Sequence, residues 1–403
     1  MLMLDLPKYK TIEAISNSSK EYISFSQGTI KISGTPAPIK KHIQEKLESD
    51  SLDYYQYVGG IYSLRTKIAE KLSKKHNVLI KPEQIIISHG SIGGITAICL
   101  TLLKEGDEVI IPTPFYPSYR NIILFSKAIP IFVEGYIREQ SAWKFDIERI
   151  KQSITSKTKM LILSNPSNPS GVCLNKEAIH ELKQWCECHG IYIVSDEVYD
   201  NYIYEGEFNS FTSYVCNSDL VIRTGSFSKD YAMSGWRVGY IVAPEPLVSS
   251  LIAVQDGTLC CPSVIGQQAA LFALEHEYLI ADQINTVKKN RDLAWHLLQP
   301  LVEKKIFSFV KPPAGIFFFM NTTFKDSEEL VMDILYKAKV ALVPGKDFGA
   351  TGLASSSIRL CFARQEAVLI EGIKRLLNYF KASSEYQAWP QSTSAVISQT
   401  GSQ

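Results

Sequence analysis

The sequence predicts an α/β fold, with a largely parallel, doubly wound sheet in a large domain and a smaller α+β domain beside it. Two observations predict this fold. Through the middle of the chain, short apolar runs alternate with segments of helical periodicity, and parallel strands need such crossover helices. After a long helical pattern, four further apolar runs alternate with one helix, which is typical of a second, smaller unit. The 403 residues are enough for both domains.

In the large domain, strands are expected wherever an apolar run ends in a polar or glycine-containing loop. These runs lie at 85–88, 108–112, 129–133, 160–164, 191–197, 220–226 and 238–243. Helices are expected to begin near Ser91, over about 116–127, and from Asn175 to Gly190. Such a succession of strands and helices predicts a sheet covered on both faces.

The smaller domain is expected after a helical pattern that extends from about Val264 to Leu301. Its strands are predicted in the apolar runs 307–310, 315–320, 341–345 and 356–362. The sequence therefore divides into an N-terminal arm with part of the small domain (1–48), a large domain (49–290), a small domain (291–382) and a loose, Ser- and Gln-rich tail (383–403).

The amino-acid composition argues against several classes of function and location. The 42 basic and 41 acidic residues give a net charge of +1, so no global field favours nucleic acid or an anionic membrane. No apolar run reaches the roughly 20 residues of a membrane helix, and Asp5 and Pro7 interrupt the start where a signal peptide would be apolar. Eight cysteines are too sparse for a disulfide scaffold, which favours the cytoplasm.

A cluster of possible metal ligands lies in the predicted helix 175–190. Cys186, Cys188 and His189 follow His180, but this C-x-C-H arrangement lacks a second pair at zinc spacing. We therefore expect a helix face and its C-terminal turn here, and no metal site.

The segment with the most specific chemistry surrounds Lys229, directly after a predicted strand. Ser226 and Ser228 precede the lysine, and Arg237 follows eight residues later. Two hydroxyl groups and a guanidinium can bind a phosphate dianion, and a lysine amine can form a Schiff base with an aldehyde. The alternative is a surface lysine and arginine on an ordinary strand-to-helix turn, and the spacing alone leaves both interpretations open.

Three further loops follow predicted strands. Asn168 lies in the rigid turn NPSNPSG, Asp196 ends an apolar strand where a buried cationic nitrogen could be paired, and Ser91 lies in a glycine-rich strand-to-helix turn. Each pattern alone is common, as a turn or as a helix cap. Ligands of open α/β sheets bind beyond the carboxyl ends of the strands, so their occurrence in one chain favours a single site.

These segments, above all SFSK…SGWRVGY at 226–240, resemble the class I/II aminotransferases, the aspartate aminotransferase-like group of fold-type-I enzymes that use pyridoxal 5′-phosphate. The resemblance extends from about Tyr22 to Leu377. It implies a seven-stranded, mostly parallel sheet between helices in the large domain. It also implies a homodimer with shared active sites.

The resemblance assigns roles to individual residues. Lys229 would form the Schiff base with the cofactor, and Asp196 would keep the pyridine nitrogen protonated. Tyr199 and Asn168 would donate hydrogen bonds to the 3′ oxygen of the ring, and Tyr116 would stack on the ring, with simple packing in a Pro-rich turn as its alternative. The phosphate would be bound by Ser91, Ile92, Ser226, Ser228 and Arg237.

The same resemblance concerns the substrate and a second subunit. Arg359 would bind the α-carboxylate, with an internal salt bridge as its alternative, and the backbone of Gly28 would contact the same carboxylate beside Asn168. Tyr55 would reach the phosphate in the neighbouring subunit, although Tyr57 is close enough in sequence to compete for that role.

The position of Ser91 bears on specificity. Some aspartate-using members of the family carry a lysine there to pair with the side-chain carboxylate of the substrate, and this chain has no cation at that position. Lys31, in the N-terminal segment, is a candidate substitute. Aspartate is therefore one candidate donor.

The function expected from the resemblance is transfer of an amino group from an L-amino acid to a 2-oxo acid such as 2-oxoglutarate, by a ping-pong mechanism in amino acid biosynthesis. One alternative keeps the cofactor but changes the outcome, as a β-eliminating carbon–sulfur lyase or a related lyase or synthase. A second alternative is a non-catalytic, cofactor-sensing regulator domain, which would be expected to carry a DNA-binding domain in front.

Overall fold

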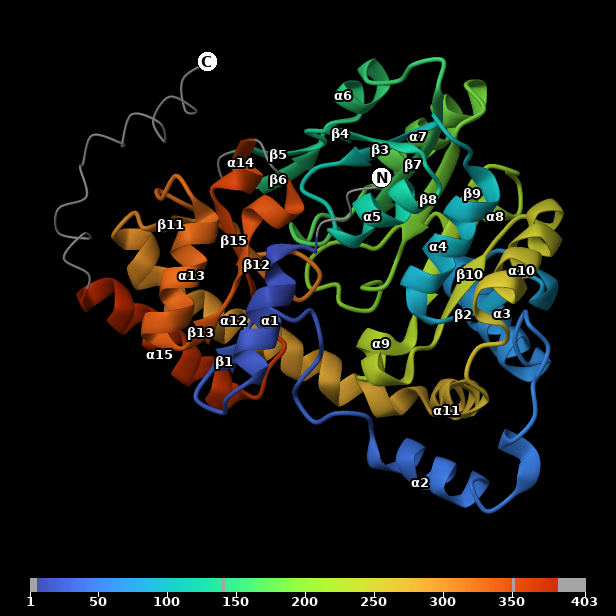
Figure 1. The fold of residues 1–403 in the computed structure, drawn as a ribbon, viewed down its shortest axis with the longest axis horizontal. Helices are drawn as coiled ribbons and strands as arrows, with labels where there is room; N and C mark the ends of the chain where they lie inside the picture. Colours follow the sequence, from blue (N-terminus) through green and yellow to red (C-terminus); the bar gives the residue numbers. More distant parts are fainter. Residues whose placement is uncertain (1–5, 140–141, 350–351, 383–403) are drawn as a thin grey trace.

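The computed structural model describes residues 6–139, 142–349 and 352–382 (Figure 1). The stretch 383–403, predicted to be a loose tail, lies outside the described residues. No helix in the described residues combines the length and the apolar character needed to cross a bilayer.

A seven-stranded sheet forms the centre of the larger part, in the order β2-β10-β9-β8-β7-β3-β4. β10 is antiparallel to both of its neighbours, and all other neighbouring pairs are parallel, which confirms the predicted mostly parallel sheet. The strands are β2 (Ile85–Ser88), β3 (Glu108–Pro112), β4 (Ile129–Val133), β7 (Thr158–Ser164), β8 (Tyr192–Asp196), β9 (Val221–Ser226) and β10 (Gly239–Val242).

Helices cover both faces of this sheet, because successive side chains of its strands point to opposite sides. Ile85 and Ile87 of β2 pack into one apolar cluster and Ile86 packs into another. One face carries α4 (Gly90–Leu102), α5 (Ser118–Phe125) and α10 (Glu245–Leu259); the other carries α3 (Tyr62–His76), α7 (Lys176–Cys188), α8 (Thr212–Val215) and α11 (Val264–Glu275). Two buried faces explain the nearly continuous apolar runs in the sequence.

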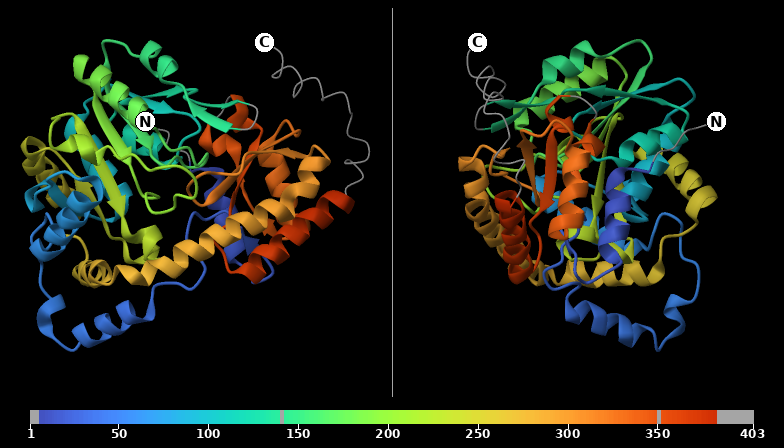
Figure 2. Two further views of the ribbon diagram at one scale, coloured as in Figure 1. Left: turned by 180° about the vertical axis from the view of Figure 1, so that it is seen from behind. Right: turned by 60° about the vertical axis from the view of Figure 1, so that its left-hand side comes forward.

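The smaller part contains an antiparallel sheet in the order β11-β12-β15-β14 and a parallel pair, β1 with β13. Its strands are β1 (Ile23–Ser24), β11 (Phe307–Ser308), β12 (Phe317–Thr322), β13 (Val340–Ala341), β14 (Val343–Pro344) and β15 (Ser357–Cys361). Its helices are α1 (Lys8–Asn17), α12 (Ala281–Glu303), α13 (Ser327–Ala338), α14 (Gly352–Ser355) and α15 (Glu366–Ala382). The long helices α12 and α15 lie side by side (Figure 2).

The N-terminal segment contacts both parts of the chain. Helix α1 packs on β14 and α13, and β1 pairs with β13, whereas α2 (Ala37–Lys46) packs on α11 of the larger part. The domain boundaries at residues 48, 290 and 382 stay a prediction.

The helical pattern 264–301 is interrupted, which the sequence analysis did not predict. Helix α11 ends at Glu275, a short 3₁₀ segment follows at Glu277–Ile280, and α12 then begins at Ala281. Of the predicted strand 307–310 only two residues pair, and the run 341–345 contributes to two separate sheets.

Several shorter elements were not predicted, because they lack a clear apolar period. They are the hairpin β5 (Tyr136–Glu139) and β6 (Ala142–Phe145), helices α6 (Ile147–Gln152) and α9 (Phe227–Asp230), and the 3₁₀ turns at Asp50–Leu52, Pro82–Gln84, Ser234–Trp236 and Gly345–Phe348.

The predicted helix at 175–190 is α7, and its ends follow from local chemistry. Asn175 caps its first turn, since the side-chain oxygen accepts a hydrogen bond from the Ala178 amide at 2.8 Å. Cys186 is buried in the core, and the Nδ1 of His189 lies 2.8 Å from the Trp185 carbonyl at the C-terminal turn.

The start of α4 is held close to the sheet at a glycine contact. A Cβ on Gly239 of β10 would lie 2.5 Å from the carbonyl carbon of Gly90 and 2.6 Å from the amide nitrogen of Ser91. Only a residue without a side chain allows this approach, so Gly239 fixes the N-terminus of α4 against β10.

We predict that Gly239→Ala lowers the free energy of unfolding by about 1–3 kcal/mol, because the added methyl group must push α4 away from β10. Urea denaturation followed by circular dichroism measures the change. Gly257→Ala is the matched control: its Cβ would meet nothing within 4 Å on helix α10, so it should be neutral or slightly stabilising. Equal effects of the two substitutions would contradict this account of Gly239.

Candidate active site

A cavity of about 520 Å³ lies where three neighbouring parallel strands end. Ser164 ends β7, Asp196 ends β8 and Ser226 ends β9, and all three line the cavity. The small-domain strand β15 and helix α1 close it from the other side. Of the residues predicted for the site, the cavity is lined by Gly28, Ser91, Ile92, Tyr116, Asn168, Asp196, Tyr199, Ser226, Ser228, Lys229, Arg237 and Arg359.

Asp196 is buried, and both of its carboxylate oxygens are anchored. Oδ2 accepts a hydrogen bond from the Tyr119 hydroxyl at 2.7 Å, and Oδ1 accepts one from the Thr224 hydroxyl at 3.0 Å. Burial raises the pKa of Asp196, while the two hydroxyl donors lower it. The carboxyl group of Asp196 is therefore held in one orientation at the wall of the cavity.

Lys229 lies in the one-turn helix α9, directly after β9, and its amine donates a hydrogen bond to the carbonyl oxygen of Gly28. Burial, aided by the nearby guanidinium of Arg359, lowers the pKa of Lys229 to about 8. An amine with this pKa is partly uncharged near neutral pH, which a nucleophilic or proton-accepting amine requires.

One corner of the cavity combines hydroxyl groups, a guanidinium and a helix N-terminus. The Ser226 hydroxyl donates to the Ser228 hydroxyl at 2.9 Å, and Arg237 donates to the Ser234 carbonyl at 2.7 Å. A Cβ on Gly90 would lie 2.7 Å from Nη2 of Arg237, and Gly90 has φ +72°, so the guanidinium lies against the glycine that begins α4. Free backbone amides at a helix start and a nearby guanidinium favour an anion such as phosphate.

Arg359 of β15 is buried and has no carboxylate within ion-pair distance among residues 6–139, 142–349 and 352–382. Its Nη1 donates to Oδ1 of Asn168 at 3.1 Å and its Nη2 donates to the Ser26 carbonyl at 2.5 Å, while its Nε has no partner. The guanidinium lies over the rings of Phe317 and Phe348, 4.2 and 4.9 Å from their centroids. A buried cation with an open donor suits a carboxylate ligand.

The predicted aromatic residues occupy different environments. The Tyr199 ring packs edge-on against Phe317 with 5.7 Å between centroids, and Tyr116 packs edge-on against Tyr119 at 5.6 Å. Tyr55 is 86% exposed and does not line the cavity, so it is apart from the other predicted residues in this chain.

Sequence reasoning missed several residues that line or support the cavity. Tyr119 and Thr224 anchor Asp196. Thr224 could have been found from the sequence, because it lies two residues before Ser226 on the strand next to that of Asp196. Helix α1 contributes Tyr9, Lys10 and Glu13, and no motif in the sequence indicates this placement. Its start is held from far along the chain, since the Tyr9 amide donates to Oδ2 of Asp347 at 2.8 Å.

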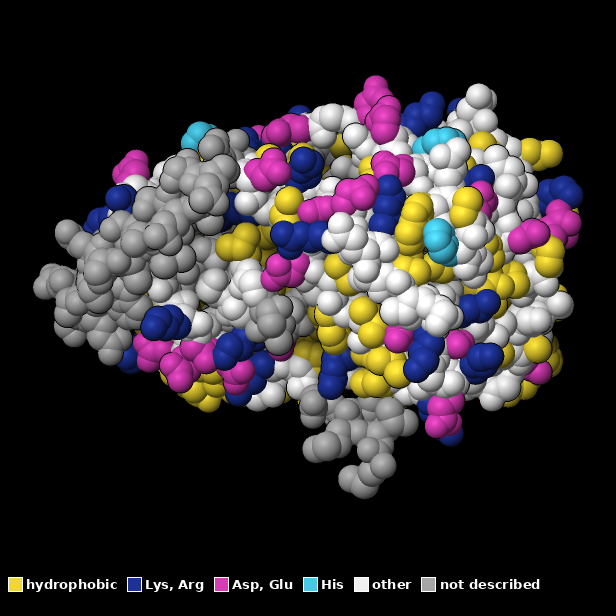
Figure 3. Space-filling view, turned by 90° about the horizontal axis from the view of Figure 1, so that it is seen from above, with side chains coloured by type: hydrophobic (Ala, Val, Ile, Leu, Met, Phe, Trp, Pro, Cys, Tyr) yellow, Lys and Arg dark blue, Asp and Glu magenta, His cyan; other side chains and the backbone are white. Residues whose placement is uncertain are grey.

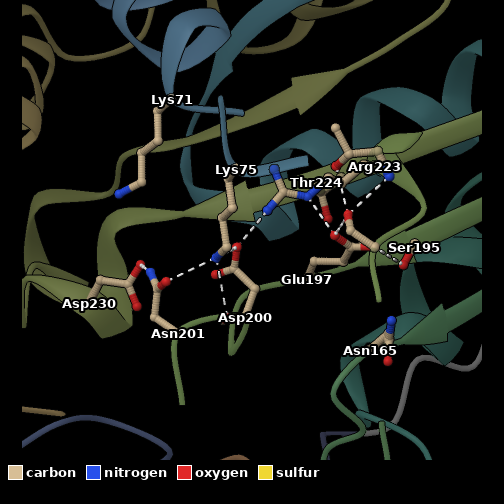
Figure 4. Close-up of polar contacts among 12 residues, drawn as sticks. Lys71, Lys75, Asn165, Ser195, Glu197, Asp200, Asn201, Arg223, Thr224 and Asp230 are labelled. Carbon is tan, nitrogen blue, oxygen red and sulfur yellow. Dashed lines mark hydrogen bonds and ion pairs between the residues drawn. The ribbon is translucent and has the colours of Figure 1, made fainter. Parts of the chain in front are cut away.

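A buried network of charges supports the strand ends (Figure 4). Arg223 of β9 pairs with Glu197 at 2.7 Å and with Asp200 at 2.9 Å, and Asp200 also pairs with Lys75 at 3.0 Å. Lys75 and Arg223 hold the pKa of Asp200 below its usual value in spite of burial. Glu197 directly follows Asp196, so the network fixes the loop that carries the cavity carboxylate.

These residues fit the cofactor that the resemblance implies. A buried carboxylate faces the cavity where a pyridinium nitrogen needs pairing, an amine of lowered pKa is available for an aldehyde, and the start of α4 with Arg237 and two serines can bind a phosphate. Nothing in this set requires a metal ion.

Comparison with known proteins agrees with this site. The family Aminotransferase class I and II matches residues 20–376. The chain is 32% identical over 333 residues to a probable aspartate/prephenate aminotransferase of Aquifex aeolicus, covering 80% of this chain and 82% of that protein. It is 31% identical over 343 residues to an aspartate aminotransferase of Bacillus subtilis, covering 82% and 84%.

Solved structures give the same result. A crystal structure of an aspartate aminotransferase from Thermotoga maritima superimposes with a TM-score of 0.81 at 26% identity, covering 93% of this chain and 96% of that one. These relatives support the transaminase and lend no support to the lyase or regulator alternatives. The chain belongs to the class I and II aminotransferases, enzymes that depend on pyridoxal phosphate and act on amino acids and 2-oxo acids.

Proposed function

We propose that this cavity is the transaminase active site, with Lys229, Asp196 and Arg359 as its central residues. The observation that supports this proposal is their arrangement in one cavity. A partly uncharged amine, an anchored carboxylate and a buried guanidinium without an acidic partner all line it. Each matches one requirement of the reaction: a base, a counterion for the cofactor ring and a binding group for the substrate carboxylate.

We propose the following division of roles toward the cofactor. Ser226, Ser228, Arg237 and the backbone at Ser91 and Ile92 hold the phosphate. Asp196 pairs with the pyridinium nitrogen, Tyr116 stacks on the ring, and Asn168 and Tyr199 bind its 3′ oxygen. When bound, pyridoxal phosphate supplies an aldehyde and an electron-withdrawing ring that makes the Cα–H bond of an amino acid acidic.

The chain's own residues then bind, orient and move a proton. Lys229 would hold the cofactor through its amine, and the same amine, when free, would accept the Cα proton of the bound amino acid. Arg359 and the backbone of Gly28 bind the α-carboxylate and so orient the Cα–H bond. The same groups bind the 2-oxo acid in the second half of the reaction, which gives ping-pong kinetics at one site.

The charges of the cavity favour a dicarboxylic substrate such as aspartate. Five cations line the cavity: Lys10, Lys31, Lys229, Arg237 and Arg359. Lys10 is paired with Glu13 at 3.1 Å, and the roles above use the three deeper cations. This leaves Lys31, on the exposed rim, available for a second carboxylate of the substrate. With 2-oxoglutarate as acceptor, the same lysine would serve both substrates.

We propose that the enzyme works as a cytoplasmic homodimer in amino acid biosynthesis, with Tyr55 reaching the phosphate of the partner's site. Tyr54, Tyr55, Tyr57 and Tyr62 are 67%, 86%, 56% and 60% exposed, an unusual gathering of large exposed aromatic residues that favours a protein interface. All eight cysteines are free, in keeping with a reducing compartment. On the face seen in Figure 3, acidic and basic side chains are interspersed.

The first test is Lys229→Ala. This variant should lose transamination entirely, because the other lysines that line the cavity in the described part of the chain, Lys10 and Lys31, belong to the N-terminal segment and have no contact with Asp196. Borohydride reduction followed by mass spectrometry should leave the cofactor attached to the wild-type protein and to none of the variant. A variant that retains turnover would overturn the assignment of Lys229.

The lowered pKa of Lys229 gives a pH prediction. The uncharged amine is the form that attacks an aldehyde, so its fraction rises as pH rises through about 8 and levels above it. Capture of pyridoxal phosphate by the cofactor-free protein, followed by stopped-flow absorbance, should therefore rise from pH 6.5 and reach a plateau near pH 9. A rate that still increases steeply between pH 9 and 10.5 would mean an ordinary lysine.

Lys31→Gln tests the substrate proposal. We expect kcat/KM for aspartate to fall about fivefold, the size of an exposed ion pair, with kcat/KM for alanine unchanged. Lys40→Gln is the control, because Lys40 is exposed on α2 and does not line the cavity. If aspartate and alanine are affected equally, Lys31 has no role in recognising the side-chain carboxylate.

A further inference from the structure

Arg364 is a buried cation outside the cavity, and none of the roles above uses it. It is 2% exposed and follows β15 by three residues. We propose that Arg364 is a positioning residue that holds the backbone of residues 24–31 against the cavity, so that Gly28 meets the amine of Lys229 and the carboxylate of the substrate. The part that concerns substrate rests on the proposed function.

The guanidinium of Arg364 binds backbone carbonyls from one short segment. Its Nε donates to the Ser24 carbonyl at 2.7 Å, its Nη1 to the Thr29 carbonyl at 2.7 Å, and its Nη2 to the Gln27 carbonyl at 2.7 Å. A fourth donation goes from Nη1 to the Ala363 carbonyl at 3.0 Å. One planar group thus fixes three carbonyls within six residues, which a lysine could not do.

The segment has little else to hold it. Across residues 26–30, all of which the structure describes, no backbone–backbone hydrogen bond forms. Regular pairing resumes only at its ends, where the Phe25 amide donates to the Ala341 carbonyl at 2.8 Å and the Lys31 amide to the Ala363 carbonyl at 3.0 Å. The path of the backbone between these points depends on side chains, and Arg364 makes the largest share of those contacts.

The segment forms one wall of the cavity. Gln27, Gly28, Thr29 and Lys31 all line it, and the Gly28 carbonyl accepts the hydrogen bond from Lys229. Arg364 itself does not line the cavity, so it acts through the backbone that it holds. Its own carbonyl accepts a hydrogen bond from Asn290 of α12 at 2.6 Å, which anchors the backbone of Arg364 to the longest helix of the described chain.

A buried charge without an acidic partner is costly unless its donors are satisfied. Among residues 6–139, 142–349 and 352–382, no carboxylate lies within ion-pair distance of Arg364. Backbone carbonyls therefore satisfy this cation, and it binds them in return. A merely structural arginine of this fold is paired differently: Arg291 of α12 contacts Glu205 at 3.0 Å and Asp292 at 2.9 Å.

The test compares Arg364→Lys with Arg291→Lys, a matched change of a buried arginine that does not line the cavity. The first readout is the pH midpoint of pyridoxal phosphate capture by the cofactor-free protein. Loss of the Gly28 carbonyl removes an acceptor that favours the charged amine of Lys229, so the midpoint should fall by about one pH unit in Arg364→Lys and stay in place in Arg291→Lys.

The second readout is steady-state kinetics. In Arg364→Lys, KM for the amino acid and for the 2-oxo acid should both rise about tenfold, with kcat within threefold of wild type, because a contact that binds the carboxylate equally in the ground and transition states is weakened, while Arg359 still orients the substrate and the base remains. Arg364→Gln, which keeps two donors without the charge, is the second variant if the lysine variant does not fold, and it should show the same pattern.

The proposal is overturned if, in a folded variant, the capture midpoint stays at the wild-type pH and both KM values stay within twofold of wild type, or if Arg291→Lys changes them equally. A wild-type protein that transaminates no amino acid would refute the proposed function. The capture midpoint would still test Arg364 in that case, because it needs no turnover.

Discussion

The pairing of β8 with β9 fixes the site, because its register sets Asp196 beside Thr224. The next strand, β7, brings Ser164 opposite Asp196 by the same parallel pairing. A carboxylate, its hydroxyl anchor and the turn that carries Lys229 are thereby placed within one edge of the sheet. A slip of one residue would turn every one of these side chains to the opposite face.

Burial has the largest effect on the pKa values of the two main groups in this cavity, and it shifts them in opposite directions. It lowers the pKa of the Lys229 amine and raises that of the Asp196 carboxyl. Tyr119 and Thr224 counteract the second effect by donating hydrogen bonds to the carboxylate. The larger part of the chain supplies these two groups, and the smaller part supplies Arg359, the buried guanidinium on the other side of the cavity.

Much of this arrangement was predictable from sequence, for a physical reason. Strands buried on both faces appear in the sequence as apolar runs. The residues at the carboxyl ends of such parallel strands must lie at one edge of the sheet, and Asn168, Asp196 and Lys229 are examples. The prediction was weaker where tertiary contacts decide the structure. The break between α11 and α12 has no proline or glycine signal at His276, and helix α1 reaches the cavity through Asp347, more than 300 residues away in sequence.

The distance along the chain between the two walls of the cavity also affects how the protein acquires its shape during synthesis. The segment that carries Gly28 is made early, yet its partner strand residue Val340 and the guanidinium of Arg364 are made more than 300 residues later. Contacts of such long range are slow to form, and the ribosome extends a chain by only about 5–20 residues per second. The large sheet can therefore assemble first. The N-terminal wall stays unpaired, and accessible to chaperones, until β13 and Arg364 have left the ribosome.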